Sequence, residues 1–259
     1  MAYTIATAGK GGTGKTTIAA FFIDYLRRAH NGSILAIDAD PNSNLNQALG
    51  IELKDTVVGI LDKVAGMKEG LLSGMTKDRF IEYEIQSAVS EGDGFDLLAM
   101  GRPEGPGCYC YANNVLRGLI EKLSSGYDFV VVDNEAGMEH LSRRITRSID
   151  SLFIISDFSR VGIRSARRIS DLAKEMEIKV GGEYLIINMA RSGINPLKAE
   201  VDKSSLKLAG VIPFDEKIED LSLEGKPVVE VLEMSLVKRI FEYTIAQQRP
   251  DLITDNKKV

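Results

Sequence analysis

The sequence predicts a doubly wound α/β fold, in which helices cover both faces of a mostly parallel sheet of about seven to eight strands. Two observations lead to this prediction. Short apolar runs alternate with segments whose apolar residues recur at three- and four-residue spacing, as they do in amphipathic helices. The apolar runs carry Ile, Leu and Val at successive positions, which is typical of parallel strands that are buried on both faces.

The predicted elements follow one another in a regular order of strand and helix. The predicted strands cover residues 3–7, 33–40, 95–100, 127–133, 151–156, 183–188 and 208–213. The predicted helices cover residues 15–29, 113–125, 162–176 and 235–248. No repeat, low-complexity segment or linker interrupts this order. Residues 1–259 are therefore predicted to form one domain, with a frayed polar tail at about residues 250–259.

Composition and charge exclude several classes of protein. The chain is 44% hydrophobic and 27% charged, as soluble globular proteins are. No run approaches the ~18 to 20 apolar residues of a membrane span, and Met1 leads directly into a predicted strand, so we expect a cytoplasmic protein with no membrane partner. The net charge of −5 argues against a nucleic-acid partner, because wrapping phosphates requires a positive field.

The segment GKGGTGKTT fits the phosphate-binding pattern GxxxxGK[ST], lies after a predicted strand and opens a predicted helix. Its glycines allow backbone amides to surround phosphate oxygens, while Lys15 reaches the β- and γ-phosphates and Thr16 holds Mg²⁺. A glycine-rich turn without a ligand is the alternative. The residues predicted to contact ATP or ADP here are Gly9, Lys10, Gly11, Gly12, Thr13, Gly14, Lys15, Thr16 and Thr17. The domain is accordingly predicted to be a P-loop ATPase domain.

Lys10 is a second lysine inside the loop, and KGGTGKT resembles the deviant Walker A loop of the MinD/ParA-like ATPases, within the SIMIBI class of P-loop NTPases. That group includes plasmid-partition, cell-division-site, nitrogenase iron-protein and metal-delivery ATPases. The resemblance implies that Lys10 reaches the nucleotide of a partner subunit and that two copies form a homodimer around ATP. A solvated loop lysine is the alternative, although a cation beside a triphosphate has an evident catalytic use.

Acidic residues end two predicted strands, where such an ATPase needs them. Asp133 ends FVVVD and is expected to bind Mg²⁺ through water, and Gly137 in the following DNEAG is expected to sense the γ-phosphate. The segment IDADPNSNL resembles the first switch of the class, which implies that Asp38 activates the attacking water and that Asp40 acts around the metal. Helix capping is an equal alternative for Asp40.

The position of a residue within these motifs also predicts catalytic roles and contacts with adenine. Lys10, Lys15 and Asp38 are the predicted catalytic residues. Asn188 and Pro213 stand where relatives contact adenine.

The sequence has two cysteines, Cys108 and Cys110, which follow a predicted strand of the sheet. In a reducing compartment such a pair is more often a metal or redox site than a disulfide. Thiolate-bound Ni²⁺ or Zn²⁺ usually takes about four ligands, and His30 and His140 are more easily explained as surface or packing residues. Two copies of the pair meeting on a two-fold axis would supply the missing ligands.

The segments GRPEGPGCYCYANNVLR (101–117) and DNEAGMEHLSRR (133–144) together resemble the CooC-type accessory ATPases. These mature the nickel centres of carbon monoxide dehydrogenase and of the associated acetyl-CoA synthase. The resemblance implies a homodimer that binds Ni²⁺ or Zn²⁺ through the paired cysteines. It also implies that ATP hydrolysis assists nickel insertion into one of these two client enzymes.

Two other functions remain open. An ATP-dependent reductase with a bridging iron–sulfur cluster also uses two cysteines per subunit, but from separate segments. A MinD/ParA-like positioning ATPase should show a basic surface or a C-terminal amphipathic helix. Arginines do occur in residues 142–147 and 160–168, but interspersed acidic and apolar residues favour an ordinary solvated helix face.

Overall fold

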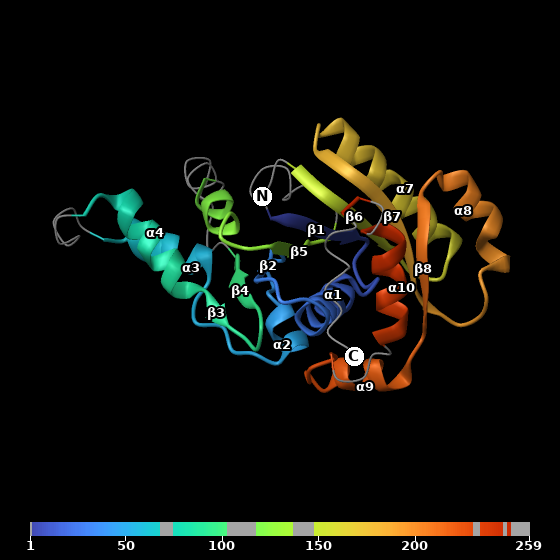
Figure 1. The fold of residues 1–259 in the computed structure, drawn as a ribbon, viewed down its shortest axis with the longest axis horizontal. Helices are drawn as coiled ribbons and strands as arrows, with labels where there is room; N and C mark the ends of the chain where they lie inside the picture. Colours follow the sequence, from blue (N-terminus) through green and yellow to red (C-terminus); the bar gives the residue numbers. More distant parts are fainter. Residues whose placement is uncertain are drawn as a thin grey trace.

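A single sheet organises the described part of the chain. The computed structural model describes residues 2–67, 75–102, 118–136, 148–229, 234–245 and 248–249. Within them, eight strands lie in the order β3-β4-β2-β5-β1-β6-β7-β8, with helices on both faces (Figure 1). The strands are β1 (Tyr3–Gly9), β2 (Ile34–Asp38), β3 (Ser90–Glu91), β4 (Asp96–Ala99), β5 (Phe129–Asp133), β6 (Ser148–Ser156), β7 (Lys179–Ala190) and β8 (Lys207–Pro213). All pairings are parallel except that of the short β3 with β4. The predicted fold class is confirmed.

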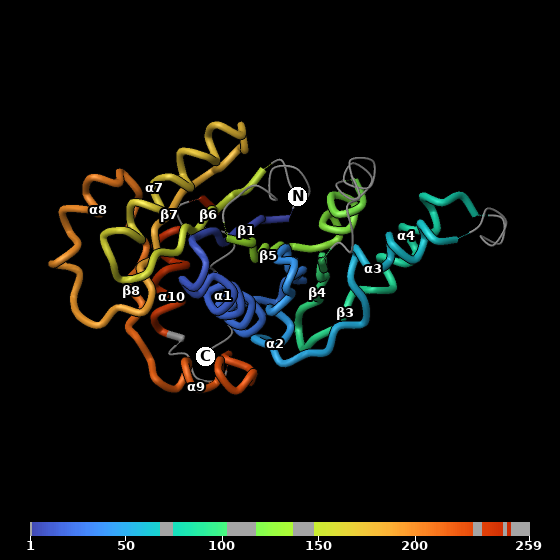
Figure 2. Tube along the Cα trace, turned by 180° about the vertical axis from the view of Figure 1, so that it is seen from behind, coloured from blue at the N-terminus to red at the C-terminus, as the bar shows by residue number. Residues whose placement is uncertain are grey.

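The helices divide between the two faces of the sheet, as the front and rear views show (Figures 1 and 2). Helices α1 (Lys15–Ala29), α2 (Leu45–Leu49) and α10 (Met234–Thr244) contribute to one core. Helices α3 (Val57–Ala65), α4 (Lys77–Ala88), α7 (Arg160–Glu175) and α8 (Lys198–Ser204) contribute to the other. The short η1 (Asn195–Leu197) precedes α8, and α9 (Glu216–Leu223) follows β8.

Strand β5 shows why the apolar runs lack alternation. Val130 and Val132 pack into one core, whereas Phe129 and Val131 pack into the other. Successive side chains of a strand point to opposite faces, so a strand covered by helices on both sides needs an apolar residue at every position.

Some elements differ from the sequence prediction. Strands β6 and β7 are longer than the segments predicted for them, and α2, α3, α4, α8 and α9 were not predicted at all. Helix α3 begins without acidic residues in its first turn, and its cap is Thr56, whose hydroxyl accepts a hydrogen bond from the amide of Gly59 (3.1 Å). A threonine cap before an apolar run is a weak sequence signal, because the same run could form a buried strand.

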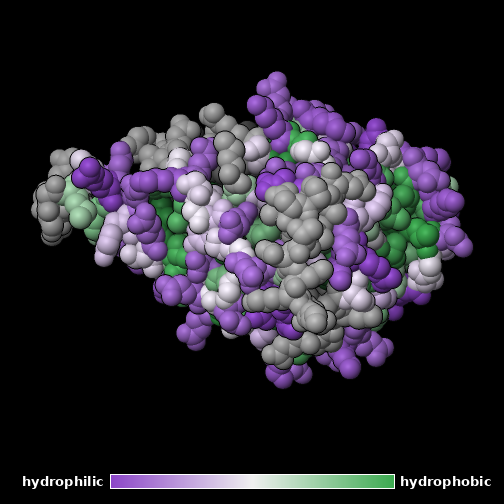
Figure 3. All heavy atoms as spheres, viewed as in Figure 1, coloured by the Kyte–Doolittle hydropathy of each residue, from purple (hydrophilic) through white to green (hydrophobic). Residues whose placement is uncertain are grey.

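The surface is mostly hydrophilic in the view of Figure 3, with smaller hydrophobic areas between charged side chains. Among the described residues, no helix combines the length and apolar character that crossing a membrane requires.

An aromatic cluster joins α1 to the sheet and to α10. The ring of Phe22 lies 4.7 Å from that of Phe153 and 5.0 Å from that of Phe241, measured between centroids. All three side chains are almost completely buried. Because α1 carries the lysine and threonine of the phosphate loop at its first turn, this cluster fixes the position of the loop.

Replacement of Phe22 by Ala should therefore lower the free energy of unfolding by about 3–5 kcal/mol, through lost apolar burial and the cavity left behind. Urea denaturation followed by circular dichroism measures the change. Tyr83→Ala is the matched control, since that ring is 58% exposed, and should change stability by less than about 0.5 kcal/mol.

Candidate functional site

The loop between β1 and α1 wraps tightly around a position where phosphate can bind. Gly14 precedes α1 with a φ of 86°, in the left-handed region that favours glycine. A Cβ at Gly9 would lie 2.5 Å from the carbonyl oxygen of Ile155, so this position also requires glycine. The amide groups at the start of α1 are thereby presented at the carboxyl edge of the sheet, where helix dipoles favour anions.

The two loop lysines differ in environment. Lys15 is buried (7% exposed), and its ammonium group donates to the carbonyl oxygen of Lys10 (3.4 Å). Burial lowers the pKa of Lys15, and the carboxylate of Asp133 opposes that shift. Lys10 itself is exposed at the rim of the loop. A buried ammonium group that donates to a neutral carbonyl is suited to bind an anion.

Asp38 and Asp133 are register partners on β2 and β5 and stand together at the carboxyl ends of these strands. Asp38 is fully buried and accepts hydrogen bonds from the amides of Asp40 (3.1 Å) and Leu45 (2.9 Å). Burial, followed by the neighbouring Asp133 carboxylate, raises the pKa of Asp38 to about 7. The carboxyl group therefore changes charge near neutral pH.

Asp133 is 1% exposed, and burial raises its pKa to about 6, against the lowering effect of hydrogen bonds from Thr16 and Thr7. Its Oδ1 accepts from the hydroxyl of Thr7 (3.0 Å). Its Oδ2 has no hydrogen-bond partner among the described residues. A buried carboxylate oxygen with spare acceptor capacity beside the phosphate loop fits Mg²⁺ or a water bound to it.

Thr7 and Asn134 support this carboxylate and were missed by the sequence analysis. The side-chain amide of Asn134 donates to the carbonyl oxygen of Thr7 (2.7 Å), which links the ends of β1 and β5. Thr7 lies in an apolar strand and carries no motif, so only the register of β1 on β5, which pairs it with Asp133, reveals its position.

A hollow of about 580 Å³ lies above the loop, within the range of small-molecule sites. Gly11, Gly12, Gly14, Lys15, Thr16, Thr17 and Asp40 line it, together with Glu135 and Ala136. The remaining lining comes from two neighbouring groups of residues: Asn42, Asn44, Gln47 and Ala48, and Ser222, Gly225, Lys226 and Val228. Asn42 and Asn44 lie in the segment that resembles the first switch. The other residues of these two groups were not predicted, because they belong to elements without a phosphate-binding pattern.

The comparison with protein families decides the kind of site. The family model described as the CobQ/CobB/MinD/ParA nucleotide binding domain matches residues 4–228. The chain belongs to the CobQ/CobB/MinD/ParA family. It is thus a P-loop ATPase of the MinD/ParA class.

Similar proteins within the family carry different names. An uncharacterized ATP-binding protein of Methanocaldococcus jannaschii is 40% identical over 92% of this chain and 95% of its own length. The carbon monoxide dehydrogenase accessory protein CooC of Rhodospirillum rubrum is 27% identical over 91% of this chain and 97% of its own. The septum site-determining protein MinD complexed with Mg-ADP from Pyrococcus horikoshii has a TM-score of 0.68 at 20% identity, with both chains fully covered, which shows a shared fold.

The two predicted adenine contacts lie toward the ends of β7 and β8 in this family member. Asn188 is 7% exposed, and its side-chain amide donates to the carbonyl oxygen of Thr13 in the phosphate loop (3.0 Å). Pro213 is exposed at the end of β8. Neither is among the described residues that line the hollow, so the contact with adenine stays a prediction.

Asp40 lies in the turn before α2 and does not cap that helix, whose N-cap is Asn44. Its predicted role around the metal stays a prediction. Its carboxylate accepts hydrogen bonds from the amide (2.9 Å) and side chain (3.1 Å) of Asn42, which shapes the turn before α2. It also lines the hollow, together with Lys15.

Gly137, Cys108, Cys110 and His140 lie outside the described residues. His30 is 9% exposed and packs against the rings of Tyr25 and Phe129, in agreement with a packing role. Among the residues that the structure describes, no group of three or more His, Cys, Asp or Glu side chains could hold a metal ion.

The arginine-rich helix α7 has acidic partners. Arg164 pairs with Glu200 (2.7 Å) and Arg167 with Asp171 (3.3 Å), and Arg167 also donates to the carbonyl oxygen of Ser204 (2.9 Å). Part of the positive charge of the helix is therefore neutralised within the chain.

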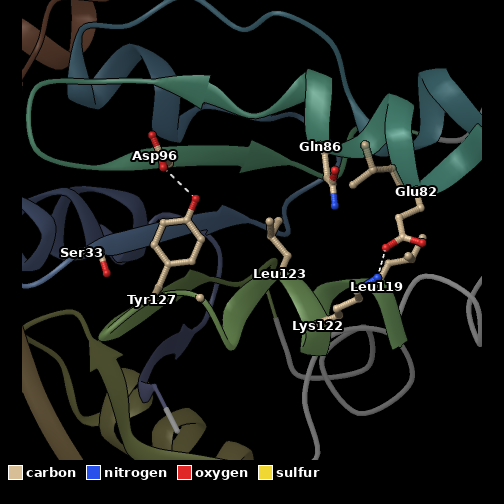
Figure 4. A pocket seen from close by; sticks show the side chains of 10 residues that line it. Ser33, Glu82, Gln86, Asp96, Leu119, Lys122, Leu123 and Tyr127 are labelled. Atoms are coloured by element: carbon tan, nitrogen blue, oxygen red, sulfur yellow. Dashed lines mark hydrogen bonds and ion pairs between the residues drawn. The ribbon is translucent and has the colours of Figure 1, made fainter.

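A second hollow, of about 480 Å³, lies between α4 and the helical residues 118–124 (Figure 4). Tyr127 donates to Asp96 (2.7 Å) at one end, and Lys122 pairs with Glu82 at the other. Asp96 begins β4 and Tyr127 precedes β5, so this hollow is at the amino ends of the strands. Ligand sites of open parallel sheets form at the carboxyl ends, where the phosphate loop is.

The buried carboxyl group of Asp133 predicts how the stability of the protein depends on pH. Because the folded-state pKa of Asp133 is raised, the folded protein prefers the neutral side chain, and stability is lost as the pH rises from about 4 through 6. Asp133→Asn should therefore stabilise the nucleotide-free protein at pH 8 by about 2–3 kcal/mol, and this gain should shrink as the pH falls toward 4. Denaturant unfolding at several pH values measures it; a gain that is independent of pH would contradict the role of the charge.

Proposed function

We propose that the chain is a Mg²⁺-dependent ATP hydrolase that acts as a homodimer. The observation that carries the proposal is the buried pair of carboxyl groups, Asp38 and Asp133, of which Asp133 interacts with Lys15 at the end of the phosphate loop. Bound Mg²⁺ would be held by Thr16 and, through water, by Asp133, and would offset the charge of the β- and γ-phosphates. The role of Lys10, contact with nucleotide across the dimer, belongs to the same proposal.

The chain's own groups divide the work of hydrolysis. Lys15 and the loop amides hold the γ-phosphate and stabilise the charge that develops on it. Asp38 accepts a proton from the attacking water while the water oxygen bonds to phosphorus and the bond to ADP breaks. A pKa of about 7 suits this role, because a general base works best when its pKa lies near the operating pH.

Asp38 also connects the nucleotide site to the strand that leads to the cysteines. Its carbonyl oxygen accepts a hydrogen bond from the amide of Met100 (2.8 Å), whose own carbonyl accepts from Val58 at the start of α3 (2.9 Å). The chain continues from Met100 toward Cys108 and Cys110. A shift of Asp38 on nucleotide binding or hydrolysis would therefore act on the first residues of the cysteine segment.

We extend the proposal to metal delivery: two copies of Cys108 and Cys110 bind one Ni²⁺ or Zn²⁺, and ATP turnover assists nickel insertion into carbon monoxide dehydrogenase or acetyl-CoA synthase. The cysteine spacing and the 27% identity to CooC over nearly the whole chain support this. A positioning ATPase is the second candidate. It is favoured by 31% identity, over 80% of this chain and 69% of the relative, to the maintenance of carboxysome distribution protein A of Synechococcus elongatus.

Hydrolysis can be tested by separating binding from turnover. Asp38→Asn should lower the ATPase rate by about 100-fold or more while ATP still binds, because the base is lost and the loop remains. Lys15→Gln should lower the ATPase rate and also weaken ATP binding. Asp93→Asn, a change of the same kind at a side chain that is 96% exposed, should leave phosphate release and calorimetric ATP binding unchanged. Full activity of Asp38→Asn would remove Asp38 from the mechanism.

Metal delivery is tested by the double variant Cys108→Ser and Cys110→Ser. We expect the wild type to bind about one Ni²⁺ or Zn²⁺ per dimer, with an affinity that depends on ATP and falls at low pH because thiolates must lose protons. The variant should lose this binding and keep ATP binding. Metal analysis with light scattering gives stoichiometry and mass. Metal binding that survives the double change would reject the cysteine site, and a brown, iron-containing protein would favour a reductase.

A further inference from the structure

The nucleotide hollow has a wall that comes from the C-terminal third of the chain. The turn that follows α9 contributes Gly225 and Lys226, and it lies against α2, which also lines the hollow. Among the described residues that line the hollow, the bases are Lys15 and Lys226 and the acids are Asp40 and Glu135. Lys226 therefore brings a second positive charge to a site whose floor already holds Lys15.

The backbone of this turn is fixed by three contacts. The amide of Lys226 donates to the carbonyl oxygen of Leu221 (2.8 Å). The amide of Val228 donates to the carbonyl oxygen of Ala48 in α2 (3.1 Å), and the side chain of Val228 is 3% exposed in the core that surrounds α1. The backbone from which the Lys226 side chain extends is thus held in place on both sides.

The ammonium group of Lys226 is able to exchange partners. It pairs with Glu224 (2.6 Å), but both side chains are more than half exposed, 62% and 55%. Exposed ion pairs contribute little to stability, and a phosphate oxygen offers a denser negative charge than a carboxylate. Exchange of Glu224 for a phosphate group thus has a low cost.

We infer that Lys226 is a second cation of the nucleotide site, which releases Glu224 and binds the polyphosphate of ATP or ADP. The inference rests on the proposed function in one respect, that the hollow binds ATP. It assigns to Glu224 an inhibitory role, because this carboxylate competes with the nucleotide for the ammonium group. The hydrogen bond from the Val228 amide to the Ala48 carbonyl oxygen connects the turn that carries Lys226 to α2.

The test is nucleotide binding by four proteins: the wild type, Lys226→Met, Glu224→Gln and the double variant. Lys226→Met should weaken ATP and ADP binding by about fivefold, the contribution of an exposed charge pair. Glu224→Gln should strengthen both by about two- to threefold. In the double variant the gain from Glu224→Gln should disappear, because it acts through Lys226. Isothermal calorimetry with ATP, ADP and adenosine in excess Mg²⁺ measures these changes.

Two controls separate a direct phosphate contact from a change in net charge or in the shape of the hollow. Lys217→Met, on the exposed surface of α9, makes the same change in net charge and should leave affinity unaltered. Adenosine should bind all four proteins alike. An equal loss for adenosine, or a gain from Glu224→Gln that persists without Lys226, would overturn the inference. A wild type that fails to bind ATP would instead reject the proposed function itself.

Discussion

Two buried carboxyl groups on neighbouring parallel strands impose a constraint on the whole nucleotide site. Asp38 and Asp133 are held side by side because β2 and β5 are in register, and both faces of these strands are covered by apolar side chains. Both carboxyl groups are almost completely buried. Their mutual repulsion is relieved by protons or by positive charge, and the buried ammonium group of Lys15 supplies part of that charge. The pair is thus electrostatically strained in a way that a metal ion would relieve.

Asp38 also forms hydrogen bonds to two separate backbone segments, in addition to its proposed role in activating water. Its side chain accepts hydrogen bonds from the backbone that leads into α2, and its carbonyl oxygen accepts one from the residue after β4. A change in its charge or position therefore reaches two segments at once. One of them borders the hollow above the phosphate loop, and the other continues in sequence toward the cysteine pair. These contacts support the proposed coupling of ATP turnover to the segment that follows β4.

The sheet, the phosphate loop and the acidic strand ends could be predicted from the sequence, because each depends on a short local pattern. Burial on both faces produces a continuous apolar run in β5, and the loop needs glycines at fixed positions. Thr7 and Lys226 could not be predicted in the same way. Thr7 matters because β1 pairs with β5, and Lys226 because the turn after α9 packs on α2, and both facts arise from contacts between residues far apart in the chain. Helices α3 and α4 were missed although their buried residues do recur at helical spacing, as Ile81, Ile85 and Ala88 do in α4.

The hydrogen bond from Val228 to Ala48 has a consequence for biosynthesis. It joins a residue near the start of the chain to one that leaves the ribosome only when most of the sheet has been made. A nascent chain that has completed β1, α1 and β2 contains the residues of the phosphate loop. It lacks β5, which lies between β1 and β2 in the sheet, and the lining that follows α9. Premature capture of nucleotide by a partly synthesised chain would thus be weak, and full affinity would arise only with the last segments of the fold.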